Sequence, residues 1–315
     1  MKIFLTGGTG FIGSYVALEL LQAGHHLTIY ARNADKIPAF GQFKEIEFLE
    51  GTLTDLKTIK NQIPGHDVCI HVALNYTKDL GAEIILDDTL PTVLMADIAA
   101  YAGVQQFIYT SSTAANDSLY MGDQNQLEDR PKIVNQRTKQ HPATFYGATK
   151  AASENYLIAQ SHLTTLRVNI IRPGYTFGNP VVEGAPTQSD TRFKQIVEDA
   201  IQNRPIRVIK NDGTQFIWAG DLAKLYLAVL NSDFNRKTYF GLSKNFISWE
   251  SIANEAVRRC NSKSLVKVED KGWDEEGTIW DVSDMKNDFG LEFDPWEQIC
   301  EHLDYYIQDL SYMKN

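Results

Sequence analysis

The segment Tyr146-Gly147-Ala148-Thr149-Lys150 places a phenol and an ammonium four residues apart. On a helix, residues at this spacing lie on one face, about one turn from each other. A phenol with an ordinary pKa of about 10 is a poor base at neutral pH, and a neighbouring ammonium favours its phenolate form. The pair therefore indicates a proton-transfer site. The same spacing also arises by chance in amphipathic helices, so the interpretation needs support from other segments.

Hydroxyl groups end a buried, strand-like run earlier in the chain. Residues 106–110 are mostly apolar, and Thr110-Ser111-Ser112-Thr113 follows at the carboxyl end of that run. Open α/β sheets bind ligands at the carboxyl ends of their strands. The sequence therefore predicts a hydroxyl donor for a substrate oxygen at this edge.

A glycine-rich loop near the N-terminus has the pattern of a dinucleotide site. Thr6-Gly7-Gly8-Thr9-Gly10-Phe11-Ile12-Gly13 lies between an apolar run at residues 2–6 and a helical pattern at residues 11–23. Glycines at such a turn let the backbone approach a pyrophosphate, and the helix N-terminus offers free N–H donors. The strand, loop and helix context predicts dinucleotide binding.

The second predicted strand ends in Ala31-Arg32, where a site specific for NAD usually has an acidic residue that binds the ribose 2′-hydroxyl. Ala31 leaves room for a 2′-phosphate, and Arg32 and Lys36 supply positive charge for it. This pattern favours NADP over NAD. The alternative is that both side chains are ordinary surface charges.

These segments must be positioned by a repeating pattern of elements. Apolar runs typical of buried strands alternate with stretches of helical periodicity, which predicts a doubly wound parallel sheet of the Rossmann type. The predicted strands are residues 2–6, 27–31, 46–49, 68–72, 106–110 and 165–171, and the predicted helices are residues 11–23, 53–62, 82–102, 146–161, 192–202 and 221–230.

The regular alternation ends after Pro173, where glycines and prolines cluster. We expect residues 1–172, with returning segments around 214–241, to form the dinucleotide-binding domain. Residues 173–213 and 242–315 are expected to form a smaller C-terminal α/β lobe that binds substrate.

Composition excludes several other classes of protein. The 315 residues are 43% hydrophobic and 22% charged, which is typical of a globular α/β protein. The formal net charge of -10 is the wrong sign for a protein that binds a nucleic-acid backbone. The three cysteines form no metal-ligand or disulfide pattern, and no targeting or membrane segment is evident. We expect a cytoplasmic protein with no metal site.

The glycine loop, the hydroxyl cluster and the Tyr-Lys pair occur here in the order typical of the extended short-chain dehydrogenase/reductase superfamily. The chain resembles its NAD(P)-dependent epimerase/dehydratase group over nearly its whole length. The residues that carry the resemblance are 6–13, 67–73, 107–112, 146–151 with Glu154, 172–174 and, more faintly, 218–223.

The resemblance implies a nicotinamide cofactor, a small-molecule substrate and a homodimer formed through the helices at residues 82–102 and 146–161. It implies that Ser112 binds the substrate oxygen, that Tyr146 is the general acid/base, and that Lys150 tunes the phenol and binds the nicotinamide ribose. The full set of expected cofactor contacts is Gly7, Thr9, Gly10, Phe11, Ile12, Gly13, Arg32, Lys36, Leu53, Val72, Ala73, Leu74, Tyr146, Lys150 and Pro173. Ser112, Thr113, Tyr175 and Trp218 are the candidate substrate contacts.

Departures from the group's patterns narrow the reaction. Sugar 4,6-dehydratases carry an Asp-Glu pair where this chain has Thr113 and Ala114, which disfavours dehydration. Nucleotide-sugar epimerases usually have an arginine shortly before the late aspartate, here Asp221, and residues 213–218 contain none. The candidates to replace that arginine are Arg192, Arg204, Arg207 and Lys210.

Three functions remain open. The first is net hydride transfer between NADP(H) and a carbonyl compound or secondary alcohol. The second is 4-epimerisation of a nucleotide sugar with NAD retained in the site. The third, a sensor that binds dinucleotide without turnover, is disfavoured by the presence of Ser112, Tyr146 and Lys150 together.

Overall fold

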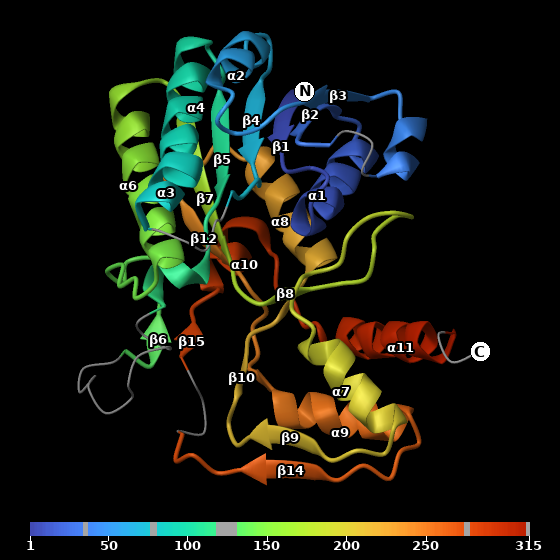
Figure 1. Cartoon of the computed structure of the whole chain (residues 1–315). Helices are drawn as coiled ribbons and strands as arrows, with labels where there is room; N and C mark the ends of the chain where they lie inside the picture. The colour runs from blue at the N-terminus through green and yellow to red at the C-terminus, as the bar shows by residue number, and fades with distance from the viewer. Residues whose placement is uncertain (34–36, 76–80, 118–130, 274–277, 313–315) are drawn as a thin grey trace.

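The computed structural model describes residues 1–33, 37–75, 81–117, 131–273 and 278–312. Figure 1 shows an upper part built around a sheet and a lower part made of α7, α9, α11 and short strands. The strands are β1 (Lys2–Thr6), β2 (His26–Ala31), β3 (Ile46–Glu50), β4 (Val68–His71), β5 (Gln106–Thr110), β6 (Ile133–Val134), β7 (Arg167–Pro173), β8 (Thr176–Phe177), β9 (Ile206–Ile209), β10 (Gly213–Thr214), β11 (Ile217–Trp218), β12 (Thr238–Gly241), β13 (Ile247–Ser248), β14 (Val266–Glu269) and β15 (Ile279–Trp280).

Helices alternate with these strands. The α-helices are α1 (Phe11–Gln22), α2 (Leu56–Gln62), α3 (Gly81–Ile84), α4 (Leu90–Tyr101), α6 (Phe145–Leu163), α7 (Arg192–Ile201), α8 (Ala219–Leu230), α9 (Trp249–Arg259), α10 (Ser283–Phe289) and α11 (Trp296–Tyr312), and three further turns are η2 (Pro38–Gln42), η3 (Ile85–Thr89) and η4 (Thr113–Asn116).

Seven of the strands form one parallel sheet in the order β12-β7-β5-β4-β1-β2-β3. The chain reverses its direction of progress across the sheet between β1 and β4, which is where ligands bind in folds of this type. The predicted Rossmann-type sheet is therefore confirmed, and the six strands expected from apolar runs all belong to it.

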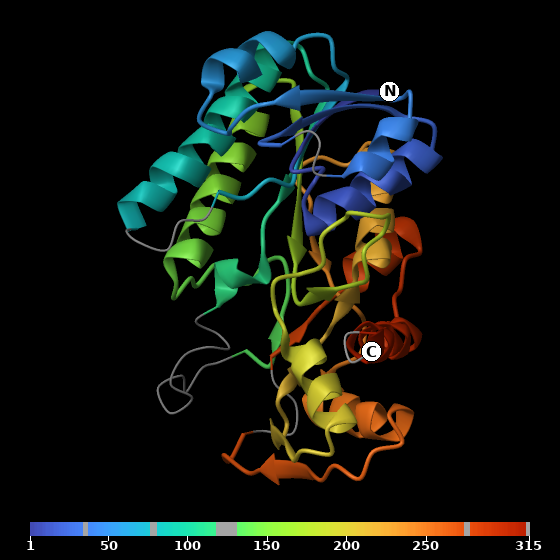
Figure 2. The ribbon, with the colours of Figure 1, turned by 45° about the vertical axis from the view of Figure 1, so that its right-hand side comes forward.

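Both faces of the sheet are covered, because its strands are apolar on both sides. One layer of helices contains α1 and α8, and the other contains α2, α4 and α6; the turned view in Figure 2 shows the sheet between them. The first layer packs on Ile29 and Ile70, and the second packs on Phe4 and Phe107. The carboxyl edge of the sheet is thus held between two rigid cores.

A third core lies below the sheet. Helices α7, α9 and α11 pack together around aromatic side chains, among them Phe193, Phe216 and Trp249. The ring centroids of Phe216 and Trp249 are 5.0 Å apart in an edge-to-face arrangement, which is favourable for aromatic pairs. The division into two domains at residue 172 remains a prediction.

The helix expected at residues 82–102 is interrupted. Residues 81–84 and 90–101 are α-helical, but Ile85–Thr89 forms a wider π-helical turn in which the N–H of Leu90 binds the carbonyl of Ile85. Pro91 follows immediately and has no N–H to donate, so a regular α-helical ladder cannot continue through this point. The apolar periodicity of the segment gave no sign of the interruption.

Within the ranges that the structure describes, no helix has the length and apolar content required to cross a lipid bilayer.

Candidate functional site

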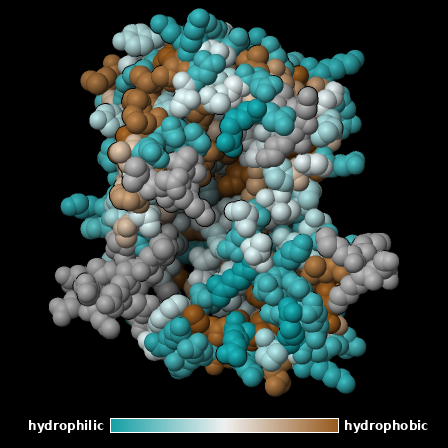
Figure 3. All heavy atoms as spheres, in the orientation of Figure 1, coloured by the Kyte–Doolittle hydropathy of each residue, from teal (hydrophilic) through white to brown (hydrophobic). Residues whose placement is uncertain are grey.

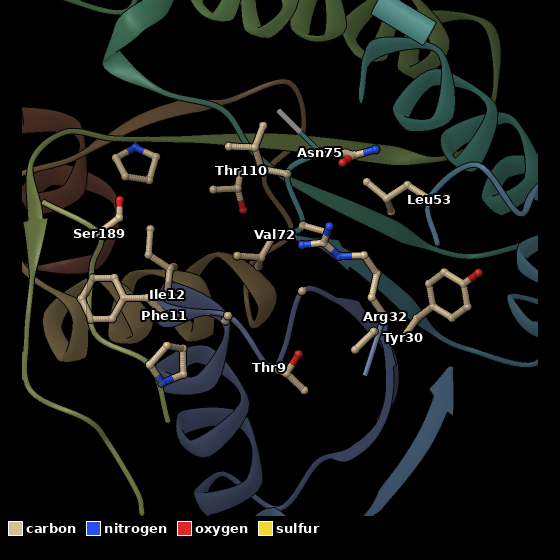
Figure 4. A pocket seen from close by; sticks show the side chains of 18 of the residues that line it. Thr9, Phe11, Ile12, Tyr30, Arg32, Leu53, Val72, Asn75, Thr110 and Ser189 are labelled. Carbon is tan, nitrogen blue, oxygen red and sulfur yellow. The ribbon is translucent and has the colours of Figure 1, made fainter. Parts of the chain in front are cut away.

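A cleft of about 850 Å³ opens at the carboxyl edge of the sheet. Its walls come from the loops that follow β1, β2, β3, β4, β5 and β7, from the start of α6, and from residues 186–189 (Figure 4). The position between β1 and β4 is the switch point of the sheet order. Every expected cofactor contact within the described residues lines it, namely Gly7, Thr9, Gly10, Phe11, Ile12, Gly13, Arg32, Leu53, Val72, Ala73, Leu74, Tyr146, Lys150 and Pro173.

The glycine loop forms the floor of the cleft beside β4. Gly7 has a φ of 73°, a left-handed conformation that favours glycine. A Cβ atom built on Gly7 would lie 2.6 Å from the backbone nitrogen of Ala73, so a side chain there would push the two loops apart. The loop therefore needs glycine both for its turn and for its approach to the next strand.

The start of α1 is ready to bind an anion. Gly10 occupies the N-cap position and supplies no side chain to cap the helix. The first N–H of α1 that bonds back into the helix is that of Ser14, which donates to Gly10, so the N–H groups of Phe11, Ile12 and Gly13 precede the helical ladder. Unfilled donors at a helix N-terminus that lines a cleft fit a pyrophosphate.

The end of β2 forms one side of the cleft. Ala31 is buried, and the exposed Arg32 extends its side chain into the cavity (Figure 4). The hydroxyl of Tyr30 donates to the carbonyl of Thr52, which holds the β3 loop in place beside Leu53. Lys36 lies outside the described residues. Arg32 is therefore the basic side chain that the described structure brings to this side of the cleft.

Ser112 lies just after the carboxyl end of β5, and its side-chain oxygen already accepts one hydrogen bond. Its Oγ accepts a hydrogen bond of 3.1 Å from the N–H of Ala114 and thereby caps the N-terminus of the 3-10 helix η4. A hydroxyl oxygen that accepts from the backbone keeps its own proton for donation. Ser112 lines the cleft, so this geometry suits a donor to a substrate oxygen.

Tyr146 and Lys150 both reach the cleft from the first turns of α6. The side chain of Thr144 caps this helix by accepting from the N–H of Gly147, and Thr144 in turn donates to the buried carboxylate of Asp117. A Cβ atom on Gly147 would lie 2.1 Å from the carbonyl oxygen of Ala114. A glycine at this position therefore lets the helix that carries Tyr146 pack directly against the turn that follows Ser112.

Lys150 is nearly inaccessible to solvent, with 3% of its side chain exposed. Its Nζ lies 5.8 Å from the ring centre of Tyr146, 5.0 Å from that of Tyr109, and 3.5 Å from Oδ2 of Asp88. Burial by itself lowers the pKa of Lys150, but the neighbouring Tyr109, Asp88 and Tyr146 groups outweigh it and raise the pKa above its ordinary value. Lys150 is therefore an ammonium at neutral pH and faces the phenol.

A buried ion pair lies behind the hydroxyl cluster. Arg172 of β7 binds both carboxylate oxygens of Glu154 of α6, and Ser111 donates to the same carboxylate. These contacts connect the ends of β5 and β7 to α6, so Ser112 and Tyr146 are held by one network.

His71 is buried next to the site but does not line the cleft. Its Nδ1 lies 2.6 Å from Oγ1 of Thr6, and its Nε2 lies 2.9 Å from Oγ1 of Thr92. Burial lowers the pKa of His71 to about 3, with a further contribution from the charge of Lys150. His71 is therefore neutral at physiological pH and has a structural position.

Three expected substrate contacts lie elsewhere. Among the described residues, the lining of this cleft does not include Thr113, Tyr175 or Trp218. Thr113 is buried in η4, Tyr175 packs its ring 4.9 Å from that of Phe216, and Trp218 packs edge-on against Tyr15. Their contact with substrate remains a prediction.

Several residues of the site carry no recognisable signal in the sequence. Residues 186–189 cover one side of the cleft, but they follow an irregular glycine- and proline-rich stretch with no periodic signal. Asn75 and Asp87 also line it, and Asp88 pairs with Lys150. The last two lie in the π-helical turn that helical periodicity does not reveal. Across the described ranges, no cluster of three or more His, Cys, Asp or Glu side chains suits a metal ion.

Comparison with known proteins agrees with this arrangement. A family model described as the NAD dependent epimerase/dehydratase family matches residues 3–239. A 3 beta-hydroxysteroid dehydrogenase/Delta 5→4-isomerase of Mycobacterium tuberculosis is 26% identical over 211 residues, which are 64% of this chain and 52% of that protein. The chain thus spans about half the length of the first curated relatives that it matches.

Other similar proteins cover the whole chain. A dTDP-D-glucose 4,6-dehydratase of Mus musculus is 24% identical, covering 100% of this chain and 91% of that protein. The crystal structure of a UDP-glucose 4-epimerase from Thermotoga maritima with UDP-glucose superposes with a TM-score of 0.77 at 16% identity, covering 98% of this chain and 100% of the other. A Bordetella bronchiseptica enzyme in complex with NAD and UDP gives a TM-score of 0.78 at 16% identity, covering 98% and 94%.

Proposed function

Because the chain belongs to the NAD dependent epimerase/dehydratase family, we propose that it is an oxidoreductase that transfers hydride between NADP(H) and a carbonyl or secondary-alcohol carbon. The observation that carries this proposal is the meeting of Ser112, Tyr146 and Lys150 in the same cleft as the glycine loop. A hydroxyl donor, a phenol and a buried ammonium at one sheet edge are the groups that such a reaction requires.

The described residues fit a dinucleotide. The uncapped start of α1 suits a pyrophosphate, and a side chain on Gly7 would fill the space between the glycine loop and Ala73. When bound, the nicotinamide supplies or receives the hydride. Lys150 and the loop at residues 72–74, which line the cleft with Ser112 and Tyr146, are the residues that would hold its nicotinamide end.

Proton transfer is the part of the reaction assigned to the chain itself. In the reducing direction, Ser112 donates a hydrogen bond to the carbonyl oxygen while Tyr146 gives that oxygen its phenolic proton. In the oxidising direction, Tyr146 takes the proton back. The ammonium of Lys150 faces the phenol ring and stabilises the negative charge that remains when the proton leaves.

Arg32 supports a preference for NADP. Its guanidinium enters the cleft beside the buried Ala31, and a guanidinium forms charge-assisted hydrogen bonds with phosphate. A 2′-phosphate would form an ion pair with this guanidinium, whereas the neutral 2′-hydroxyl of NAD could form only a hydrogen bond with it. Lys36 is proposed as a second contact on sequence grounds alone.

Net reduction is favoured over epimerisation of a nucleotide sugar. Near Asp221, where such epimerases usually have an arginine, the amide of Gln215 is bound to the backbone of Ser243 and Trp280. Three of the four possible replacements are engaged: Arg192 binds Asp212 and stacks on Trp249, Arg204 binds Asp199, and Lys210 binds Asp270. A diphosphate would have to break one of these pairs to bind there. The fourth candidate, Arg207, is exposed on β9 and does not line the cleft.

We further propose a homodimer formed through α4, α6 and the turn that precedes α4. Leu86 and Tyr156 are 58% and 62% exposed, and Ile85 and Leu90, next to Leu86, are 52% and 43% exposed. Exposed apolar side chains that lie together mark interaction surfaces. Figure 3 shows hydrophobic residues gathered over the part of the surface where Figure 1 places α4. A second copy of the same face would cover them.

The deciding experiment incubates the purified protein with ketones, aldehydes and nucleotide sugars, each with NADPH and NADH in parallel. The proposal expects oxidation of one NADPH per molecule of carbonyl compound reduced. Conversion of a nucleotide sugar without consumption of added coenzyme would establish the epimerase instead. Binding of dinucleotide with no turnover of any substrate would favour the sensor.

A further inference from the structure

The carboxylate of Asp88 is buried directly against the ammonium of Lys150. Its side chain is 0% exposed, and Oδ2 lies 3.5 Å from Nζ of Lys150. Its other oxygen, Oδ1, accepts a hydrogen bond of 3.2 Å from the backbone N–H of Asn75, which lines the cleft. Burying a carboxylate is unfavourable unless it is paired and hydrogen-bonded, and both oxygens of Asp88 have such partners.

Asp88 is the counter-ion that the described surroundings of Lys150 provide. Phenols face this ammonium from Tyr109 of β5, Tyr146 of α6 and Tyr226 of α8, and the His71 imidazole of β4 lies near it. Burial raises the pKa of Tyr109 to about 12 and also raises that of Tyr226, so both are neutral at pH 7. His71 is neutral there as well.

The backbone around Asp88 is unusual. Asp88 lies in the π-helical turn Ile85–Thr89, and its carbonyl accepts a hydrogen bond of 2.7 Å from Oγ1 of Thr92. Single π-helical turns within helices occur frequently at functional sites, where they redirect side chains. Here the turn presents one carboxylate both to a lysine of α6 and to the loop that follows β4.

We propose that Asp88 is a positioning residue of the hydride-transfer site, whose carboxylate fixes the ammonium of Lys150 and joins it to the cleft wall at Asn75. The inference rests on the proposed function, since Lys150 matters to the reaction only if Tyr146 exchanges a proton there. Asp88 touches neither substrate nor cofactor in this role. It acts by holding the Lys150 side chain in position and by stabilising its positive charge.

Asp88→Asn separates charge from shape. The amide oxygen can still accept from Asn75, but the negative charge beside Lys150 is lost. Burial then opposes the ammonium without this counter-charge, so the pKa of Lys150 falls by about one unit or more. Asp97→Asn is the matched control. It removes a carboxylate from α4, the helix that follows the turn with Asp88, at a position that does not line the cleft.

The direct test is NMR of the lysine side chains in the complete protein without substrate. The Lys150 signal is assigned by its loss in Lys150→Arg and is followed as pH is raised. We expect Asp88→Asn to lose the Lys150 ammonium signal at a pH at which the unmodified protein and Asp97→Asn still keep it. Retention of that signal in all three proteins up to the pH at which they unfold would overturn the inference.

A kinetic readout separates positioning from a merely structural role. In the reducing direction, the alkaline limb of the kcat/KM profile of Asp88→Asn should move to lower pH by a similar amount. An unmoved limb would count against the inference. If no carbonyl compound is reduced but Asp88→Asn loses the Lys150 ammonium signal at lower pH, the proposed function fails while the Asp88–Lys150 coupling stands.

A paired variant covers the case in which Asp88→Asn folds poorly. Lys150→Met leaves the carboxylate unpaired, and Asp88→Asn leaves the ammonium unpaired, so each should lower Tm. Combining both removes the two charges together, and Tm should rise above that of either single variant. Additive losses in the combined variant would show that the groups are not coupled and would overturn the proposal.

Discussion

Arg172 binds Glu154 with two parallel hydrogen bonds inside the protein, Nε to Oε1 at 2.8 Å and Nη2 to Oε2 at 2.6 Å. Each side chain is only 4% exposed. A fork-to-fork contact of this kind fixes orientation as well as distance. Because Arg172 belongs to β7 and Glu154 to α6, the contact fixes the helix that carries Tyr146 and Lys150 relative to the sheet.

Replacing one partner should therefore be severe. Glu154→Gln leaves the buried guanidinium without its counter-charge, and we expect the free energy of unfolding to fall by about 3–5 kcal/mol. Urea denaturation followed by circular dichroism measures the change. Glu292→Gln, at a surface carboxylate paired with Lys244 and Lys286, is the control and should leave stability nearly unchanged. Equal effects of the two substitutions would contradict the role of the buried pair.

Tyr146→Phe should abolish turnover without removing the dinucleotide site. The variant lacks the hydroxyl that exchanges the proton, but its ring still fills the same space against Lys150. We expect kcat to fall by about 10²-fold or more, as for loss of a general acid or base. The Kd for NADPH, measured by fluorescence titration, should change less than about threefold. Undiminished activity would refute the assignment of Tyr146.

Arg32→Asp should reverse the coenzyme preference. The carboxylate would repel a 2′-phosphate and accept a hydrogen bond from a ribose 2′-hydroxyl. The ratio of the Kd values for NADPH and NADH, measured for both proteins, should therefore invert. Equal affinity of the unmodified protein for the two coenzymes would show that Arg32 does not select between them.

Stability should decline in mild acid because of two buried imidazoles. Burial lowers the pKa of His71 to about 3 and that of His302 to about 4, whereas both take a proton near pH 6.5 when unfolded. The unfolded state then binds more protons, so stability is full above pH 6.5 and is lost as the pH falls toward these values. Between pH 7.5 and 5, each imidazole should account for a loss of about 2 kcal/mol.

His302→Gln isolates one of these contributions. The variant should start from a lower stability, because the 2.7 Å bond from His302 to Asn179 is lost. Its further decline between pH 7.5 and 5, measured by urea denaturation, should be smaller by about 2 kcal/mol. An unchanged pH dependence would mean that His302 is not buried in neutral form.

The proposed homodimer predicts a concentration-dependent mass. Leu86→Lys combined with Tyr156→Lys places charge on the exposed apolar face without altering the cleft. Light scattering after size exclusion should give twice the chain mass for the unmodified protein and the chain mass for the variant. The mass of a single chain for both proteins would contradict the proposed homodimer.

The sequence predicts this structure best where a local pattern of residues decides it. Strand runs and the glycine loop placed Ser112 and Arg32 at the carboxyl edge of the sheet, because parallel strands share one edge. The position of Asp88 could not be predicted, because helical periodicity shows only which face of a helix is apolar. It does not show where a π-helical turn rotates the side chains that follow. The cover at residues 186–189 was missed because irregular chain acquires its position from the cores on either side.

The hydrogen bonds around His71 have a fixed direction. Thr92 donates its single proton to the carbonyl of Asp88, so it must accept from Nε2 of the neutral His71. The Nδ1 of His71 then accepts from the hydroxyl of Thr6. The oxygen of Thr6 in turn accepts from the N–H of Ala73. Donors and acceptors thus run in one sense from the cleft wall to the turn that holds Asp88. The chain therefore links a backbone group of the cleft wall to the turn that carries Asp88 without a break, and it is complete only while His71 carries its proton on Nε2.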